Sequence, residues 1–335
     1  MRIFGERYKM IYAAAITGPT ASGKSALSVR VAKALGATVF SADSMQIYKE
    51  MSIGTAKIRS EEMEGVPHKM LDIASVREDF STHAYKEMAL VEAKAVIEGG
   101  GMPLFVGGTG LYLSTLTRRE EALTPGRSEE YMRRYESDAA TEEGRERLHA
   151  RLTEVDPESA AIIHKNNVRR VLRALEIFDT TGKTKTVWDK ESREGEGAVS
   201  LCHVTLDFKS RALLYSRIDR RVRQMMEGGL LCEVESLYKQ GLLTVGTASG
   251  AIGYKEFLPY FRGECSLSDV EEAICLSTRH YAKRQQTWFR RLADVKTVYM
   301  DTDAGNMRPF DEVFEEAMEH LAPFARAHYA HCKEF

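Results

Sequence analysis

The sequence has few cysteines, and those present form no metal-binding or disulfide pattern. Its 335 residues include five cysteines, which are scattered, odd in number and nowhere spaced as Cys-x-x-Cys. This distribution excludes a zinc ribbon and a disulfide framework, and it indicates reduced thiols in a cytosolic protein. His328, His331 and Cys332 are too loosely set near the C-terminus to predict a metal site.

Long apolar segments are also missing. No apolar run approaches the ~18 residues of a membrane-spanning helix, and the first residues lack the apolar h-region of a signal peptide. We therefore expect a cytoplasmic protein without a membrane partner. The net charge of −2 excludes no class of partner, because a basic face can be hidden within a balanced total. No feature indicates an obligate protein partner, and we expect a monomer.

The most informative segment that is present is Gly18–Ser25, which reads Gly-Pro-Thr-Ala-Ser-Gly-Lys-Ser. It lies between an apolar predicted strand, 11–16, and a predicted helix, 26–35, which is the context that a phosphate-binding loop requires. Backbone N–H groups of such a loop and the following helix N-terminus surround an oligophosphate. Lys24 supplies a charge, and Ser25 a hydroxyl for Mg²⁺. The predicted ligands of a diphosphate or triphosphate are Gly18, Pro19, Thr20, Ala21, Ser22, Gly23, Lys24 and Ser25. A Gly-rich turn without function is the alternative.

Two further polar residues follow predicted strands. Asp43 comes after the strand 38–41, and Thr109 lies in the Gly-rich segment after the strand 103–106. Open α/β sheets bind their ligands at these strand ends. Asp43 could hold Mg²⁺, act as a base or cap the next helix. The glycines at 107–110 allow close approach to a ligand, or they form only a turn from strand to helix.

The rest of the chain completes an α/β pattern interrupted by helices. Residues 118–198 are charged and helical, with predicted helices at 129–141 and 144–155, and strands resume at 199–208. We predict a P-loop-type parallel sheet flanked by helices, with an inserted all-helical domain. The predicted domains are the first part of the core, 1–117, the helical insertion, 118–198, the second part of the core, 199–300, and a C-terminal helix and tail, 301–335.

Two long helices are predicted in the core. The first, 81–98, has an apolar stripe formed by Ala84, Met88, Val91, Ala95 and Val96. The second, 211–239, is weakened or bent at Gly228–Gly229.

Basic residues cluster in three places, each with two interpretations. Arg169 and Arg173 are four apart and have no acidic i,i+4 partner, so they contact phosphates or form a solvated face. Arg217 and Arg221 share a polar face, where an ion-pair lattice with Asp219 is the alternative. Residues 279–291 interleave basic and aromatic side chains, which suits RNA binding or an amphipathic helix with aromatic residues in the core.

Together these segments resemble the tRNA dimethylallyltransferase family. Ordered matches run from residue 12 to about 292 and comprise Gly18–Ser25, Ser41–Tyr48, Gly54–Lys57, Val66–His68, Val106–Tyr112, Arg169–Ala174, Arg217 to Val222, Ile252–Lys255 and Tyr281 to Trp288. Ile58 departs from the family, which usually has a proline there, and residues 118–134 match poorly. The zinc-finger extension of eukaryotic members is absent, so the resemblance is to a bacterial form.

The resemblance implies transfer of the dimethylallyl group of dimethylallyl diphosphate to N6 of the adenine 3′-adjacent to the tRNA anticodon. Asp43 would be the general base, Thr109 would fix Asp43 or the adenine, and Arg217, with Arg221 second, would stabilise the departing pyrophosphate beside Mg²⁺. The implied tRNA-binding residues are Asp43, Ser44, Met45, Gln46, Thr109, Arg133 (as a candidate), Arg169, Arg170, Val171, Leu172, Arg173, Tyr254, Lys255, Lys283 and Arg284.

Three other functions remain open on the sequence alone. An adenylate isopentenyltransferase would share the chemistry but use a free nucleotide. A P-loop kinase for a small metabolite would explain Gly18–Ser25, but it would leave the helical insertion without a task. A non-catalytic, nucleotide-dependent RNA-binding switch would need Asp43 only for Mg²⁺.

Overall fold

The computed structural model describes residues 10–78, 80–117, 128–191, 197–243 and 247–332. The chain divides into two compact units. Residues up to 116 and from 199 onward form the first unit, and residues 117–198 form the second. Thr124-Pro125-Gly126, a sequence typical of a turn, lies outside the described residues.

The first unit is built on a six-stranded sheet in the order β3-β2-β4-β1-β5-β6. Every neighbouring pair of strands is parallel. The strands are β1 (Ile11–Thr17), β2 (Ala37–Ser41), β3 (His68–Lys69), β4 (Met102–Gly107), β5 (Val199–Asp207) and β6 (Val295–Tyr299). Residues 13–16 of β1 and Met102, Leu104 and Phe105 of β4 are fully buried, as expected for central strands covered on both faces. The predicted α/β class is confirmed.

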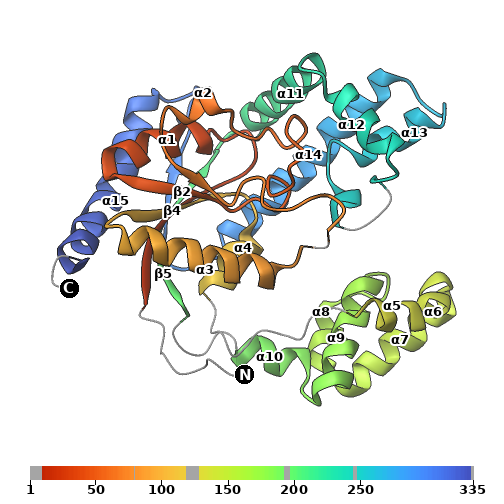
Figure 1. The fold of residues 1–335 in the computed structure, drawn as a ribbon. Helices are drawn as coiled ribbons and strands as arrows, with labels where there is room; N and C mark the ends of the chain where they lie inside the picture. Colours follow the sequence, from red (N-terminus) through yellow and green to blue (C-terminus); the bar gives the residue numbers. More distant parts are fainter. Residues whose placement is uncertain (1–9, 79, 118–127, 192–196, 244–246, 333–335) are drawn as a thin grey trace. The chain divides into compact units, whose positions relative to one another are not determined.

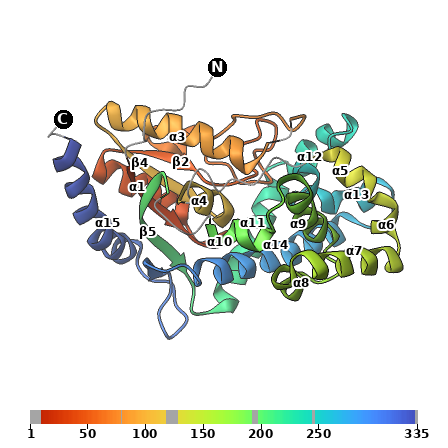
Figure 2. The same cartoon turned by 90° about the horizontal axis from the view of Figure 1, so that it is seen from below.

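Helices cover both faces of this sheet (Figure 1). The chain crosses from β1 to β2 through α1 (Lys24–Leu35), and from β3 to β4 in the opposite direction through α3 (Thr82–Glu98). Because such crossovers are right-handed, α1 and α3 lie on opposite faces, as Figure 2 shows. The C-terminal helix α15 (Phe310–Cys332) packs against α1 and β5.

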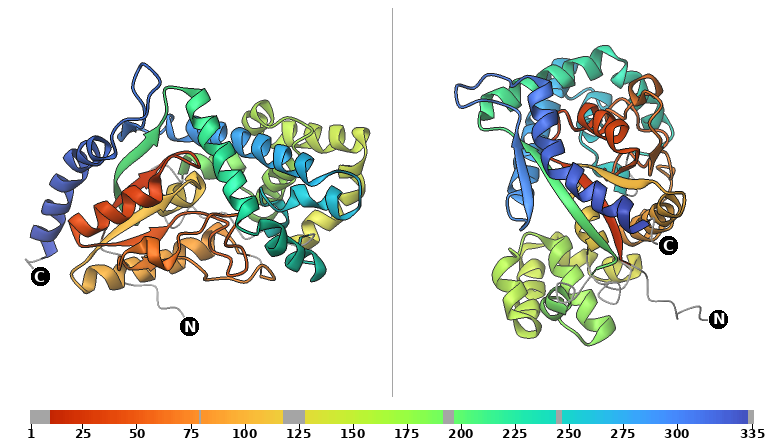
Figure 3. Two further views of the ribbon diagram at one scale, coloured as in Figure 1. Left: turned by 90° about the horizontal axis from the view of Figure 1, so that it is seen from above. Right: turned by 90° about the vertical axis from the view of Figure 1, so that its left-hand side faces the viewer.

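Further helices complete the first unit. They are α2 (Ser60–Met63), α4 (Gly110–Thr117), α11 (Arg211–Glu227), α12 (Leu230–Lys239), α13 (Leu258–Phe261) and α14 (Leu267–Phe289), with short 3₁₀ turns at Thr247–Gly250 and Lys255–Phe257. Helices α11 and α14 pack side by side (Figure 3). The buried carboxylate of Asp301 accepts hydrogen bonds from the backbone N–H groups of Lys209 (2.9 Å) and Ser210 (2.7 Å), which fixes the start of α11.

Every regular element among the described residues of the second unit is a helix. The unit contains α5 (Glu129–Arg134), α6 (Glu136–Ala140), α7 (Glu142–Val155), α8 (Pro157–Ile162), α9 (Val168–Thr181) and α10 (Lys185–Glu191). Its core gathers Leu148 and Leu152 from α7 with Val171, Leu172 and Leu175 from α9. The unit therefore has a hydrophobic core of its own.

The buried face of α3 differs from the predicted one. Met88 and Val91 are 39% and 69% exposed, whereas Tyr85 and Ala89 are fully buried. The reason is Tyr85, whose ring stacks on Tyr112 at 3.8 Å and whose hydroxyl donates to the Ser41 carbonyl at 2.9 Å. An aromatic ring with a polar end thus sets the rotation of the helix more strongly than the aliphatic stripe does.

Three predicted helical segments differ in detail from the structure. The helix predicted over 211–239 keeps both outer ends, and at the predicted weak point Gly229 takes a left-handed φ of 97° and separates α11 from α12. The helix predicted over 129–141 divides into α5 and α6 at Tyr135. The predicted C-terminal tail is helical as far as Cys332, and His328 is buried with its ring Nε2 3.3 Å from the Gly101 carbonyl oxygen.

Candidate active site

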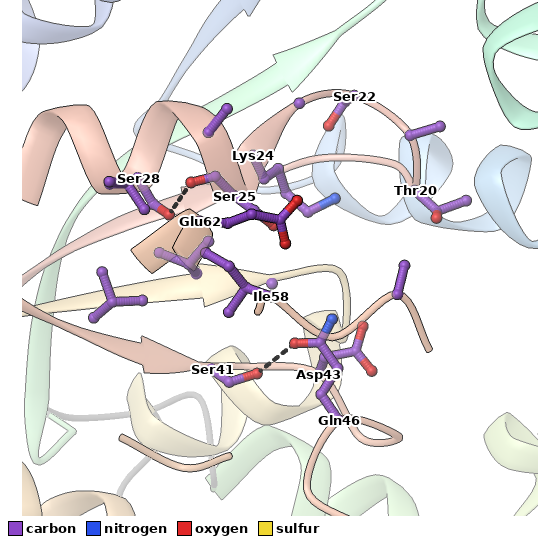
Figure 4. A pocket seen from close by; sticks show the side chains of 18 of the residues that line it. Thr20, Ser22, Lys24, Ser25, Ser28, Ser41, Asp43, Gln46, Ile58 and Glu62 are labelled. Carbon is purple, nitrogen blue, oxygen red and sulfur yellow. Dashed lines mark hydrogen bonds between the residues drawn. The ribbon is translucent and has the colours of Figure 1, made fainter. Parts of the chain in front are cut away.

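A pocket of about 740 Å³ opens at the carboxyl edge of the sheet, within the first unit. Its lining includes the loop after β1, the segment after β2, the turn with Thr55, Ala56 and Ile58, and residues of helices α1, α11 and α14. Figure 4 shows Lys24 and Ser25 at one side of the pocket, Asp43 and Gln46 at another, and Ile58 between them. The position agrees with the ligand sites of open α/β sheets.

The Gly18–Ser25 segment joins β1 to α1, so the predicted strand, loop and helix are all present. Gly18 has a φ of 141°, and a Cβ there would lie 2.4 Å from the Leu206 carbonyl oxygen. Gly23 (φ 95°) caps α1 without a side-chain hydrogen bond. The first backbone N–H groups of α1 are therefore directed to the pocket, where an anion can accept from them.

Positive charge is concentrated beside this loop. The Lys24 ammonium donates to the Pro19 carbonyl at 2.7 Å, and burial together with the charge of Arg221 lowers the pKa of Lys24 to about 7. Burial also lowers the pKa of Arg221, with a smaller contribution from Arg217. The negative charge of Asp43 acts in the opposite direction on the pKa of Lys24 and on that of Arg221. A ligand with more than one negative charge would relieve the repulsion among these cations.

Two buried polar atoms at the pocket lack a partner among the described residues. They are the Ser22 hydroxyl oxygen and the Arg221 Nε. Because buried polar groups are normally hydrogen-bonded, these atoms indicate a missing ligand. Both residues line the pocket, and an N–H or O–H group suits the oxygens of a phosphate group.

Arg217 connects α11 to the phosphate loop. Its Nε donates to the Ala21 carbonyl at 2.8 Å, and burial followed by repulsion from Arg220 lowers its pKa. The alternative of an ion-pair lattice with Asp219 is not realised, because the Asp219 carboxylate binds Arg279 (Nε to Oδ1 3.0 Å). Arg217 and Arg221 therefore belong to the pocket.

Asp43 follows β2 and does not cap a helix. Its Oδ1 accepts a hydrogen bond from the Met45 N–H at 2.9 Å and closes a turn. Thr109 follows the neighbouring strand β4 and lies next to the Asp43 segment. The Thr109 N–H donates to the Ala42 carbonyl at 3.1 Å, and its hydroxyl oxygen accepts from the Ser44 N–H at 3.0 Å. Thr109 thus holds the backbone on both sides of Asp43.

Gln285 and Tyr281, both on α14, are pocket residues that the sequence analysis did not assign. The Gln285 side chain accepts from the Thr20 N–H at 2.8 Å and donates to the Gly108 carbonyl at 3.0 Å, so it joins two loops of the site. Tyr281 is four residues earlier on the same helix face, where burial and the Asp43 charge raise its pKa to about 12. Their i,i+4 spacing within the basic-aromatic segment was the available signal.

The structure corrects one of the predicted tRNA contacts in the first unit. Tyr254 is fully buried, and its hydroxyl donates to the Glu233 carboxylate at 2.6 Å. Gln46 lines the pocket, where it accepts from the Ser41 hydroxyl (3.1 Å) and donates to the Thr55 carbonyl (3.2 Å). Exposed Lys255, Lys283 and Arg284 and half-buried Ser44 and Met45 are accessible.

Within the helical unit the predicted contacts divide into exposed and buried ones. Arg133, on α5, and Arg169 and Arg170, on α9, are exposed. The side chains of Val171 and Leu172 are core, each 1% exposed, so their predicted tRNA contact was wrong for the side chains. Arg173 has an acidic partner after all, three residues away: its Nη1 lies 2.6 Å from Oε2 of buried Glu176.

Neither a metal cluster nor a membrane span is found in the described part of the chain. No group of three or more His, Cys, Asp or Glu side chains there is placed to hold a metal ion. Of the helices described, none is both long and apolar enough to cross a membrane. The Ser25 hydroxyl, exposed in the first turn of α1, and the Asp43 carboxylate are among the oxygen-bearing side chains that line the pocket.

Comparison with known proteins gives a consistent result. A family model described as IPP transferase matches residues 46–292. The tRNA dimethylallyltransferase of Caldanaerobacter subterraneus subsp. tengcongensis is 42% identical over 92% of this chain and 96% of its own length. That of Bacillus cereus (strain ATCC 14579) is 46% identical over 84% of this chain and 88% of its own.

Solved structures agree with these relatives. The tRNA isopentenylpyrophosphate transferase of Bacillus halodurans is similar over 98% of this chain and 100% of its own, with a TM-score of 0.69 and 38% identity. A eukaryotic dimethylallyltransferase, in a structure described as acting on tRNA, is similar over 86% of this chain and 74% of its own, with a TM-score of 0.71 and 28% identity.

The pKa of Lys24 predicts that anion binding takes up a proton. With a pKa of about 7, the Lys24 amine should be mostly neutral at pH 8 in the free protein, and a bound diphosphate should favour its charged form. Calorimetric titration with inorganic pyrophosphate at pH 8, in buffers of different ionisation enthalpy, should show greater proton uptake for the wild type than for Lys24→Met. The difference between the two cancels the titration of pyrophosphate itself. The difference in proton uptake between the two proteins should vanish near pH 5.5. Equal uptake by both proteins at pH 8 would contradict the lowered pKa of Lys24.

Proposed function

The chain belongs to the IPP transferase family, and we propose that it transfers the dimethylallyl group of dimethylallyl diphosphate to tRNA. The proposed acceptor is N6 of the adenine 3′-adjacent to the anticodon, and pyrophosphate leaves. The observation that carries the proposal is the orphaned pair of buried donors, Ser22 and Arg221 Nε, in a cationic pocket that also contains Asp43. Relatives named tRNA dimethylallyltransferase support it.

The phosphate loop would bind the leaving group. Cleavage of the allylic C–O bond moves negative charge onto the departing pyrophosphate. Loop N–H groups, the Lys24 ammonium and the Arg217 and Arg221 guanidinium groups line the space where that charge develops. Donors that are already in place stabilise the transition state more than the ground state, because the charge on the leaving oxygen is still growing.

Mg²⁺ would need only one or two protein ligands at this site. Mg²⁺ usually keeps several waters and binds phosphate oxygens with only one or two protein groups. The Ser25 hydroxyl, at the first turn of α1 beside the proposed pyrophosphate, would be the protein ligand. When bound, the ion would supply further positive charge to the leaving group.

Asp43 would be the general base. The N6 lone pair of adenine is delocalised into the ring, so the amine needs to lose a proton as its bond to carbon forms. Hydrogen bonds to Met45 and through Thr109 fix the Asp43 segment before the substrate arrives. The adenine cannot react while stacked, and turning it out into the pocket costs a few kcal/mol.

The helical unit would bind the anticodon stem-loop. Exposed Arg133, Arg169 and Arg170 present positive charge on two of its helices. Contacts of this kind go to phosphates and position the RNA, whereas base contacts near Ser44 would specify it.

The acceptor and the base can be tested together. Labelled dimethylallyl diphosphate and Mg²⁺ should label tRNA and leave AMP unlabelled, and ATP should phosphorylate neither. Asp43→Asn keeps an oxygen to accept from Met45 but removes the base, so transfer should fall by about 10²- to 10⁴-fold while tRNA binding persists. Label on AMP alone would favour a free-nucleotide transferase, a phosphorylated product would favour a kinase, and near-normal turnover by Asp43→Asn would exclude Asp43 as the base.

The role of Arg169 can be tested by salt dependence. Arg169→Ala should weaken tRNA binding and reduce the slope of log K against log salt concentration by about 1, because one phosphate contact is lost. Arg147→Ala is the matched control: Arg147 is in the same unit, but its guanidinium is paired with Asp138. If both variants keep the wild-type slope, Arg169 does not contact phosphate.

A further inference from the structure

One wall of the pocket is a short turn that has no regular secondary structure to hold it. Thr55, Ala56 and Ile58 line the pocket from this turn. Ala56 has a φ of 45°, in the left-handed region that non-glycine residues rarely adopt. The turn needs support from outside itself, and on the pocket side Gln46 binds the Thr55 carbonyl.

The support on the opposite side comes from Glu233 of α12. Its Oε2 accepts from the N–H groups of Ser52 (3.0 Å) and Ile53 (2.8 Å). Its Oε1 accepts from the N–H groups of Ile53 (3.1 Å) and Gly54 (3.1 Å). One carboxylate therefore satisfies three successive backbone donors, an arrangement in which each hydrogen bond is strengthened by the negative charge.

Tyr254 completes this contact from a third segment of the chain. Its buried hydroxyl donates to the Glu233 Oε1 at 2.6 Å. Burial and the Glu233 charge raise the pKa of Tyr254, so its hydroxyl keeps the proton that it donates. The ring lies against Gly54, where a Cβ would come within 2.5 Å of a ring carbon. Gly54 is thus the residue type that allows the turn to approach Tyr254.

We propose that Glu233 is a positioning residue for the reaction: with Tyr254 it fixes residues 52–54 and thereby orders the pocket wall formed by Thr55, Ala56 and Ile58. The chemistry that this wall serves rests on the proposed function. Glu233 touches no reacting atom, and it acts by ordering the wall before the substrate binds. Without Glu233, the substrate would have to order the turn as it binds. The loss would therefore weaken substrate binding rather than slow the chemical step.

Glu233→Gln is the sharpest substitution. The amide keeps one acceptor oxygen but places an NH₂ group against backbone N–H groups, where donor faces donor. Hydrogen exchange of the amides of residues 52–54 should become faster in this variant. In the transfer assay, KM for dimethylallyl diphosphate should rise about tenfold while kcat stays nearly unchanged.

Glu235→Gln is the matched control. It makes the same chemical change on the same helix, where Glu235 forms an exposed ion pair with Lys239 (2.8 Å). Its exchange rates and KM should equal those of the wild type. Tyr254→Phe, which removes one oxygen atom, should shift both readouts in the direction of Glu233→Gln. The double variant should be no worse than Glu233→Gln alone, because Tyr254 acts through Glu233.

The outcomes separate this proposal from the proposed function. Unchanged exchange at 52–54, or an unchanged KM, in folded Glu233→Gln would overturn the positioning role. If Glu233→Gln does not fold, the same two measurements on Tyr254→Phe decide whether the positioning role holds. If the wild type transfers no dimethylallyl group to tRNA, the proposed function fails, and the exchange measurement alone then decides whether Glu233 orders the turn.

Discussion

Half-buried positive charge around the phosphate loop is the constraint on which the rest of the site depends. Lys24, Arg217 and Arg221 line one pocket, and burial lowers the pKa of each. Such charges are unfavourable without a partner, so an anion bound in the pocket would be stabilised. Under the proposed function, a departing pyrophosphate would gain charge during the reaction and would be stabilised most at the transition state. Asp43 would balance part of the positive charge and remain available to the attacking amine.

The fold holds this arrangement by long-range hydrogen bonds rather than by the loops themselves. Three of the contributing loops follow the neighbouring strands β1, β2 and β4, which brings their ends together. Gln285 then joins the phosphate loop to the Gly108 turn, and Glu233 fixes the turn after Met51. Both come from helices of the C-terminal half of the chain, so the site is complete only when the whole core is folded.

Local patterns predicted the phosphate loop, Asp43, Thr109, the parallel sheet and the helical insertion, because each is encoded within a few neighbouring residues. Gln285 and Glu233 were not assigned, because their partners Thr20 and Ile53 lie 265 and 180 residues away in sequence. The family resemblance assigned Tyr254 to tRNA binding, whereas its side chain is buried in the structure and donates to Glu233. Side-chain exposure on a helix was equally difficult to predict, as the rotated face of α3 shows.

The central claim is that the phosphate loop releases pyrophosphate and transfers no phosphoryl group. Dimethylallyl diphosphate labelled with one isotope in the prenyl group and another in both phosphates tests this directly. After reaction with tRNA, the account predicts that all the transferred label is prenyl, bonded to adenine N6, and that the phosphorus label is recovered as intact pyrophosphate in equal amount. Phosphorus label on the tRNA, or orthophosphate as the primary product, would contradict it.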